Sequence, residues 1–144
     1  MNDKILNPKR KDAKTSTKNK KENKKPDDKK YDLEERTAVF GERIIDFVKT
    51  LSINTINKEL IRQLVKAGTS VGANYNEADG AESKKDFRHK IAICKKESKE
   101  SKHWLGMIAR ANPDRKDECR DLWSEAQELT LIFSSILSPK KENK

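Results

Sequence analysis

Apolar side chains recur at every third or fourth residue through four segments of this chain, which is the spacing of one buried face of an α-helix. The first segment begins after Asp32, a residue that can cap a helix, and ends at a polar turn over residues 52–55. The second runs from Ile56 to about Asp79, where Gly80 is well placed to end it. Their main apolar positions are Leu33, Phe40, Ile44, Phe47, Val48 and Leu51, then Leu60, Leu64, Val71 and Tyr75.

Two further helices follow. Ser83 with Asp86 three residues later resembles a capping box, with Asp in place of the usual Glu, and opens the third helix. Asn112 before Pro113 predicts a cap and a first helical position for the fourth, which Pro139 stops. The two seams are Phe87, Ile91, Cys94, Ser98, Ser101, Leu105 and Ile108, then Cys119, Leu122, Ala126, Leu129, Phe133 and Ile136. Short connections make consecutive helices antiparallel, so we expect an all-α, up-down-up-down four-helix bundle over residues 31–139.

Charge is distributed unevenly along the chain. Residues 1–30 carry twelve Lys and Arg against five Asp and Glu, residues 31–139 are balanced, and residues 140–144 form a short basic tail. The first segment has too few apolar residues to offset the entropy of ordering, so we expect a disordered Lys-rich arm. Such an arm either attracts nucleic acid through counterion release or serves only as a solubilising extension.

The composition also limits the size of the core and the cellular compartment in which we expect the protein. With 33% hydrophobic and 40% charged residues, the chain can build one modest core. No run of about 18 apolar residues could span a bilayer, and no apolar block near the start resembles a signal peptide. Cys94 and Cys119 lack CxxC spacing and are typical of reduced core residues. We therefore expect a cytoplasmic protein that does not contact a membrane.

One part of the sequence carries a family resemblance. The stretch TSVGANYNEA over residues 69–78, followed by AESKKDF over residues 81–87 and by KE, KES and WL, closely resembles the bacterial 23S rRNA intervening-sequence proteins. The resemblance spans about Tyr31 to Leu137 and implies a four-helix bundle that assembles into a ring, with a homopentamer favoured. His103 stands where that family more usually has a tyrosine, so a role tied to the tyrosine hydroxyl is not implied here.

The third helix is strongly basic. Between residues 84 and 102 it carries eight basic residues against three acidic ones. Helical spacing places most of the basic residues on one face, which predicts a stripe that contacts phosphates. The alternative is a solvated face whose cations meet acidic residues of neighbouring helices or subunits. No aromatic residue interrupts the stripe, which argues against base stacking. The candidate nucleic-acid-binding residues are Lys84, Lys85, Arg88, Lys95, Lys99 and Lys102.

The second helix carries small and polar residues in unusual places. Gly68 and Gly72 lie one turn apart, and because each costs about 1 kcal/mol relative to Ala, they indicate close approach by a neighbouring helix. A second apolar face indicates either self-association or a wider core; it comprises Ile61, Val65 and Ala73. A polar line along the same helix is either an exposed face or part of a subunit interface or ring lumen. The candidate interface or lumen residues are Gly68, Ser70, Gly72, Asn74 and Glu77.

We find no catalytic or metal-binding constellation. The pairs Asp86-x-x-His89 and Glu100-x-x-His103 resemble di-iron motifs, but they lie on one helix about 21 Å apart at 1.5 Å per residue. A di-iron site needs such pairs on two facing helices. We therefore expect no enzyme activity, no cofactor and no metal.

Two functions remain open from the sequence, and an enzyme with an unrecognised site is a distant third. The first is an oligomeric protein that binds nucleic acid through its basic third helix and its arm; RNA is favoured over DNA because the resemblance links the family to insertions in rRNA genes. The second is a non-catalytic assembly module with a protein partner, such as a reverse-transcriptase-type enzyme.

Overall fold

The computed structural model describes residues 32–139. These residues form an all-α, up-down bundle of four α-helices and one short 3₁₀ turn, which confirms the predicted fold class for this part of the chain. The predicted arm of residues 1–30 and the basic tail of residues 140–144 lie outside the described residues. In chain order the elements are α3 (Leu33–Val48), α4 (Thr55–Asp79), α5 (Lys84–Ala111), η2 (Pro113–Arg115) and α6 (Lys116–Leu137).

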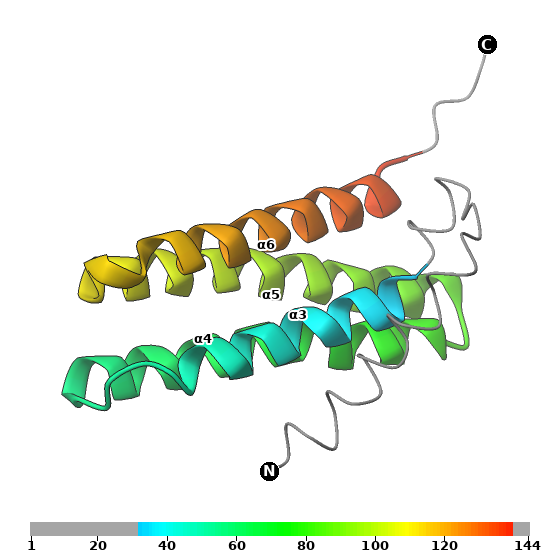
Figure 1. Cartoon of the computed structure of the whole chain (residues 1–144). Coiled ribbons are helices and arrows are strands. Elements are labelled where there is room, and N and C mark those ends of the chain that lie inside the picture. The colour runs from blue at the N-terminus through cyan, green and yellow to red at the C-terminus, as the bar shows by residue number, and fades with distance from the viewer. Residues whose placement is uncertain (1–31, 140–144) are drawn as a thin grey trace, which may run out of the picture. The chain divides into compact units, whose positions relative to one another are not determined.

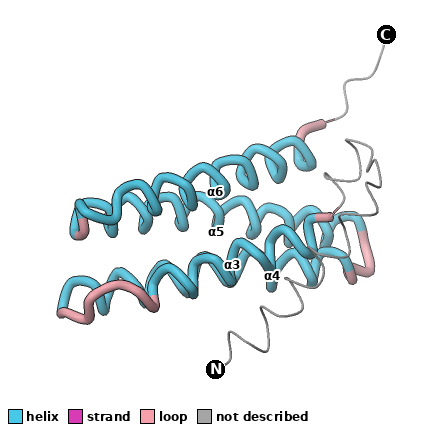
Figure 2. The backbone as a smooth tube through the Cα atoms, in the orientation of Figure 1, coloured by secondary structure: helices cyan, strands magenta, loops and turns pink. Residues whose placement is uncertain are grey.

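Each helix packs along the one that follows it in sequence, and α6 returns to lie beside α3 (Figure 1). The α3–α4 and α5–α6 connections lie at one end of the bundle, and the α4–α5 connection lies at the other. Between Leu33 and Leu137, loops are confined to these short connections (Figure 2). Short loops leave consecutive helices no alternative to antiparallel packing.

Side-chain caps account for the starts of two of the four α-helices, α4 and α5. The Asn54 side chain accepts a hydrogen bond from the backbone N–H of Asn57 at 2.8 Å and so caps α4. Ser83 caps α5 in the same way, accepting from the N–H of Asp86 at 3.0 Å, as the sequence predicted. Asp32 occupies the position before α3, but its side chain makes no capping bond there.

The predicted cap at Asn112 is wrong in its details. Pro113 opens the η2 turn, and α6 begins only at Lys116. The Asn112 side chain is drawn instead to Asn57 of α4, where the two amides exchange reciprocal hydrogen bonds of 2.9 Å each. Asn57 is 1% exposed, so leaving its side-chain amide without a hydrogen-bond partner would cost more free energy than leaving the short η2 turn without a side-chain cap.

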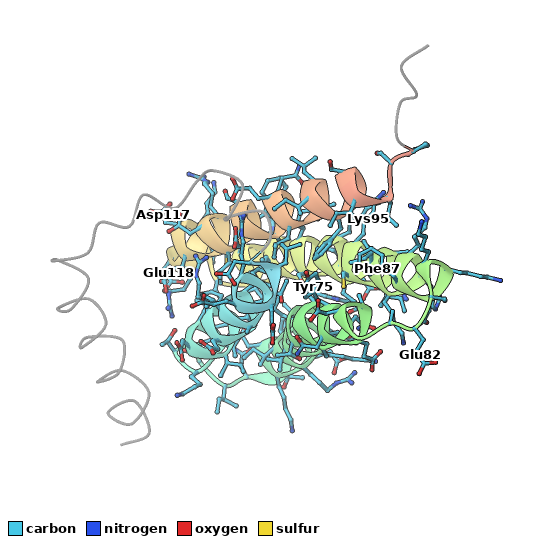
Figure 3. The ribbon with its side chains drawn as sticks, turned by 90° about the vertical axis from the view of Figure 1, so that its right-hand side faces the viewer. Tyr75, Glu82, Phe87, Lys95, Asp117 and Glu118 are labelled. Atoms are coloured by element: carbon cyan, nitrogen blue, oxygen red, sulfur yellow. The ribbon has the colours of Figure 1, made fainter. Side chains whose placement is uncertain are left out.

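One continuous core runs through the bundle. All six apolar positions predicted for the first helix are buried, as are the seam residues of α5 from Ile91 to Ile108. The core also holds hydroxyl groups, which donate to the carbonyl four residues earlier in their own helix; the Ser98 hydroxyl, for example, bonds the Cys94 carbonyl at 2.8 Å. Tyr75 and Phe87 point from α4 and α5 into the space between the helices (Figure 3). No buried side-chain nitrogen or oxygen lacks a partner among the described residues.

The glycines of α4 allow α3 to approach closely. A Cβ at Gly68 would lie 2.2 Å from Cδ1 of Ile44, and a Cβ at Gly72 would lie 3.4 Å from the backbone of Thr37. Gly41 of α3 faces the same contact, because its Cβ would lie 3.6 Å from Cα of Thr69. The predicted close approach is therefore confirmed, and the neighbouring helix belongs to the same chain.

Candidate nucleic-acid interface

The basic stripe lies on the side of α5 that borders α6. At one end, the Arg88 guanidinium donates to the carbonyl of Leu137 at 2.7 Å. Toward the other end, Nζ of Lys102 donates to the side-chain oxygen of Gln127 at 2.5 Å. Lys95 lies midway between them in the sequence of α5, and helical spacing therefore places it on the same face. These two bonds to neutral oxygens fix the stripe beside α6 while leaving both positive charges uncompensated.

Most of the predicted cations have no ion pair. Lys84, Lys85, Lys95 and Lys99 lie within 4.0 Å of no carboxylate in the described part of the chain. The alternative that neighbouring helices of the same chain neutralise the stripe is therefore not supported for these four residues. A row of unpaired ammonium groups leaves a positive potential that attracts anions.

The opposite side of α5 is different. There Nζ of Lys90 forms an ion pair with Glu77 of α4 at 2.6 Å. Glu97 lies on the same side, where burial first, and then the charge of Glu100, raise the pKa of its carboxyl, while Lys96 and Lys66 lower it. The two sides of α5 thus differ in charge. Carboxylates lie beside the cations on the side that faces α4, whereas the cations on the side that borders α6 have no carboxylate partner among the described residues.

A shallow hollow of about 350 Å³ lies among the central lysines. Its lining residues are Ala92, Lys95, Lys96, Lys99 and Glu100. The small side chain of Ala92 leaves space between the lysine stems, which allows an anionic group to reach several ammonium groups at once. The hollow thus places Lys95, Lys96 and Lys99 around one open space at the centre of the stripe.

Trp123 of α6 is a candidate that the sequence argument missed. Nζ of Lys102 lies 5.3 Å from the centroid of the Trp123 ring, and Trp123 is 41% exposed. The inference against base stacking considered the third helix alone, and the structure adds that the neighbouring helix brings an aromatic ring beside Lys102. The sequence did hold a sign of this role. Trp123 comes directly after core residue Leu122, which places it at the edge of the buried face of its helix, where an antiparallel neighbouring helix would lie.

The predicted interface residues of α4 have partners within the chain. Ser70 donates to the carbonyl of Lys66 at 2.5 Å, and Asn74 donates to the carbonyl of Ser70 at 2.8 Å. Glu77 is paired with Lys90, and Gly68 and Gly72 pack against α3. Of the second apolar face, Ile61 and Val65 pack against the core while Ala73 is exposed, so a wider core accounts for most of it. The assignment of these residues to a subunit interface or lumen stays a prediction.

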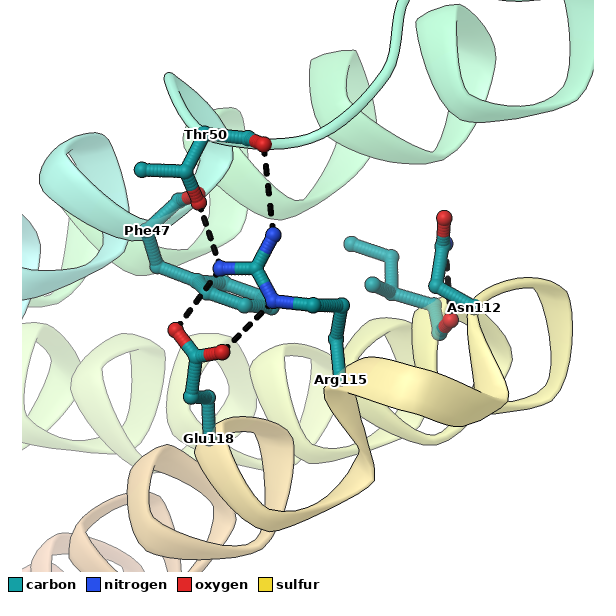
Figure 4. A network of polar contacts seen from close by, with 6 residues as sticks. Phe47, Thr50, Asn112, Arg115 and Glu118 are labelled. Carbon is teal, nitrogen blue, oxygen red and sulfur yellow. Dashed lines mark hydrogen bonds and ion pairs between the residues drawn. The ribbon is translucent and has the colours of Figure 1, made fainter.

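Polar contacts tie the bundle together at the end that carries the α3–α4 connection. The Arg115 guanidinium reaches Glu118 at 2.5 Å and the Thr50 hydroxyl at 2.6 Å, and it lies 5.3 Å from the centroid of the Phe47 ring (Figure 4). Asn112 lies beside this network. The network joins α3 to the start of α6 and so stabilises this end of the bundle. Its charged groups are paired with each other in these contacts.

The cysteines are held in an unreactive form. Burial raises the pKa of the Cys94 thiol to about 12 and that of Cys119 to about 11, so both are neutral at physiological pH. Within residues 32–139 no group of three or more His, Cys, Asp or Glu side chains is placed to hold a metal ion. Over the same residues, no helix has the length and apolar character needed to cross a bilayer.

Comparisons with known proteins agree with this architecture. The sequence model of the 23S rRNA-intervening sequence protein family matches residues 29–135. A crystal structure of a protein of unknown function from the S23 ribosomal protein family of Bacteroides thetaiotaomicron is similar, with a TM-score of 0.65 and 27% identity over 74% of this chain and 99% of that one. No curated protein is detectably similar. The chain belongs to the 23S rRNA-intervening sequence protein family.

Proposed function

We propose that this protein binds nucleic acid, with RNA preferred, through phosphate contacts made by the basic stripe of α5. The observation that carries the proposal is a row of four lysines, Lys84, Lys85, Lys95 and Lys99, which have no ion pair among the described residues and lie outside the buried seam of α5. From the first to the last, this row extends about 22 Å at 1.5 Å per residue. A surface of that length and sign can follow several consecutive phosphates.

The contacts in the stripe favour affinity over sequence selectivity. Lysine ammonium groups are point charges that bind phosphate in many orientations, whereas the bidentate fork that reads guanine edges belongs to arginine. The one arginine of the stripe, Arg88, already donates to the carbonyl of Leu137. We therefore expect binding that depends strongly on salt and weakly on sequence.

Two further features would strengthen such binding. The arm of residues 1–30 carries a net charge of +7 and would add phosphate contacts to those of the bundle. Self-association into a homopentamer, as the family resemblance implies, would repeat the stripe around a ring and raise the overall affinity. RNA is the first ligand to test, because the matching family is named for its association with 23S rRNA intervening sequences.

A second candidate function rests on a different surface. Ile53 is 88% exposed and Ile56 is 64% exposed, and both lie at the end of the bundle that carries the α3–α4 connection. Exposed large apolar side chains close together are typical of protein contacts. This surface favours a non-catalytic assembly module whose partner is another protein, such as a nucleic-acid enzyme.

One binding experiment tests the first function. Fluorescence anisotropy with a labelled RNA measures the affinity of the full chain and of two charge-matched variants. Lys95→Glu/Lys99→Glu reverses two unpaired charges of the stripe and should weaken binding by at least tenfold, because each lost phosphate contact also becomes a repulsion. Lys49→Glu/Lys58→Glu changes the net charge equally, at exposed positions away from the stripe, and should retain most of the affinity. Equal losses in both variants would show that only net charge matters.

A further inference from the structure

We propose that the groove between α5 and α6, next to the basic stripe, holds an unpaired nucleobase stacked on Trp123, so that this face selects single-stranded over duplex nucleic acid. The inference rests on the proposed function and specifies its ligand. The stripe alone offers only phosphate contacts, which duplexes and single strands both satisfy. Selection between them requires a group that recognises an unstacked base.

The groove contains a hollow of about 480 Å³. That volume falls in the usual range of small-molecule sites. On the α5 side, Gly106 opens the wall, since no described atom beyond its chain neighbours and its own helix backbone lies within 4 Å of where its Cβ would be. The lining residues are Leu105, Gly106, Ala109, Lys116, Cys119, Arg120, Trp123 and Ser124.

The order of residues along the groove links this hollow to the stripe. The two helices are antiparallel, so Lys102 and Gln127 lie level with each other and are joined by a hydrogen bond. Moving from there toward the α5–α6 connection, the groove passes Trp123 and then reaches the hollow that extends to Lys116. Trp123 therefore stands between the last cation of the stripe and the hollow. A strand whose phosphates follow the stripe would bring its next base to this ring.

The chemistry of the lining fits a base attached to a phosphate. The walls are mainly apolar or aromatic, while two cations, Lys116 and Arg120, border the hollow and no carboxylate lines it. A nucleobase presents a flat, uncharged π surface, which stacks on indole, and carries an anionic phosphate on either side. An acidic peptide would also be attracted by the cations, but its carboxylates would not need the apolar wall or the exposed ring.

Intrinsic fluorescence gives a direct test with the full chain. The protein has two tryptophans, so the variant Trp104→Phe leaves Trp123 as the only indole. We expect a 12-nucleotide oligouridine to quench the remaining fluorescence, and a 12-base-pair RNA duplex to leave it nearly unchanged at equal occupancy. Trp123→Ala in the native background should weaken oligouridine binding by about 5- to 150-fold, the usual effect of losing one stacked base. Duplex affinity should change by less than about twofold, and Trp123→Phe should restore much of the loss.

A second variant distinguishes the loss of the base site from a general effect of Trp123→Ala on folding. Gly106→Leu places a side chain in the hollow from the opposite helix without changing Trp123, and it should produce the same selective loss for oligouridine. Equal affinity of oligouridine for the native chain and both variants would overturn the inference, as would equal quenching by a polyglutamate peptide. If the native chain bound neither RNA form, the proposed function would fail together with this inference. Binding to both forms that is lost only in Lys95→Glu/Lys99→Glu would retain the phosphate stripe and reject the base site.

Discussion

The amide pair between Asn57 and Asn112 offers a measurable test of how the bundle is closed. The Asn57 side chain takes part in three hydrogen bonds: it donates to the carbonyl of Ser52 at 2.8 Å, and it donates to and accepts from the Asn112 amide at 2.9 Å. Each such bond contributes about 1 kcal/mol net. Because Asn112 is half-buried, water can replace part of the hydrogen bonding that it loses when Asn57 is removed. Asn57→Ala should therefore lower the free energy of unfolding by about 2 to 3 kcal/mol.

Urea denaturation followed by circular dichroism at 222 nm measures this change, and a thermal melt should show a fall of roughly 10 °C for a fold of this size. Asn76→Ala is the matched control, since Asn76 lies on the same helix with an exposed side chain and should change stability by no more than about 0.5 kcal/mol.

The double variant Asn57→Ala/Asn112→Ala isolates the pair itself. If the amides stabilise each other, the double variant should be less destabilised than the sum of the single variants, with a coupling energy of about 1 kcal/mol or more. Additive effects would refute the reasoning that the two amides act as a pair. A value for Asn57→Ala within 0.5 kcal/mol of the native protein would refute the larger claim that this contact closes the bundle.

Packing at two glycines and burial of two cysteines each have a measurable consequence. Gly106→Ala should raise the free energy of unfolding in urea by about 0.5 to 1 kcal/mol, because the added Cβ meets no described atom within 4 Å apart from its chain neighbours and local helix backbone, and Ala favours the helix; a loss of stability would contradict the open wall. Gly68→Val should lower it by about 2 kcal/mol or more, because the position of its Cβ is only 2.2 Å from Cδ1 of Ile44; unchanged stability would mean that the Ile44 side chain moves aside freely. Cys94 and Cys119 should react with Ellman's reagent at pH 8 only on the timescale of unfolding, and rapid labelling of either would contradict its burial. Since their pKa values of about 12 and about 11 in the fold exceed the ordinary value of 9.0, the neutral thiols contribute stability that is complete below pH 9 and is lost as the pH rises toward 12.

Periodicity predicted the helices well, and the reason is physical. The seam of α5 from Ile91 to Ile108 follows one face with a spacing of three and four, and every predicted position in it is buried. Even Ser98 and Ser101 could be assigned to the core by spacing alone, because a serine in a helix can satisfy its hydroxyl on its own backbone.

Contacts between helices were harder to predict. Asn112 has the sequence context of a cap, and only the position of Asn57, 55 residues earlier, explains why its side chain bonds elsewhere. Trp123 likewise gains its candidate role from Lys102 on another helix. The spacing of apolar residues in the sequence shows which face of a helix is buried, but it does not show which polar groups contact each other across the bundle. The candidate site depends on such contacts between helices.

The salt dependence of RNA binding tests the central claim most directly. The affinity of the full chain and of Lys95→Glu/Lys99→Glu for the same single-stranded RNA should be measured between 50 and 200 mM salt. If α5 contacts phosphates, log K should fall linearly with log salt, and the slope should become shallower by roughly 1.4 in the variant, at about 0.7 per lost phosphate contact. Equal slopes and affinities in the two proteins, with all binding lost on removal of residues 1–30, would contradict the claim and assign the interaction to the arm alone.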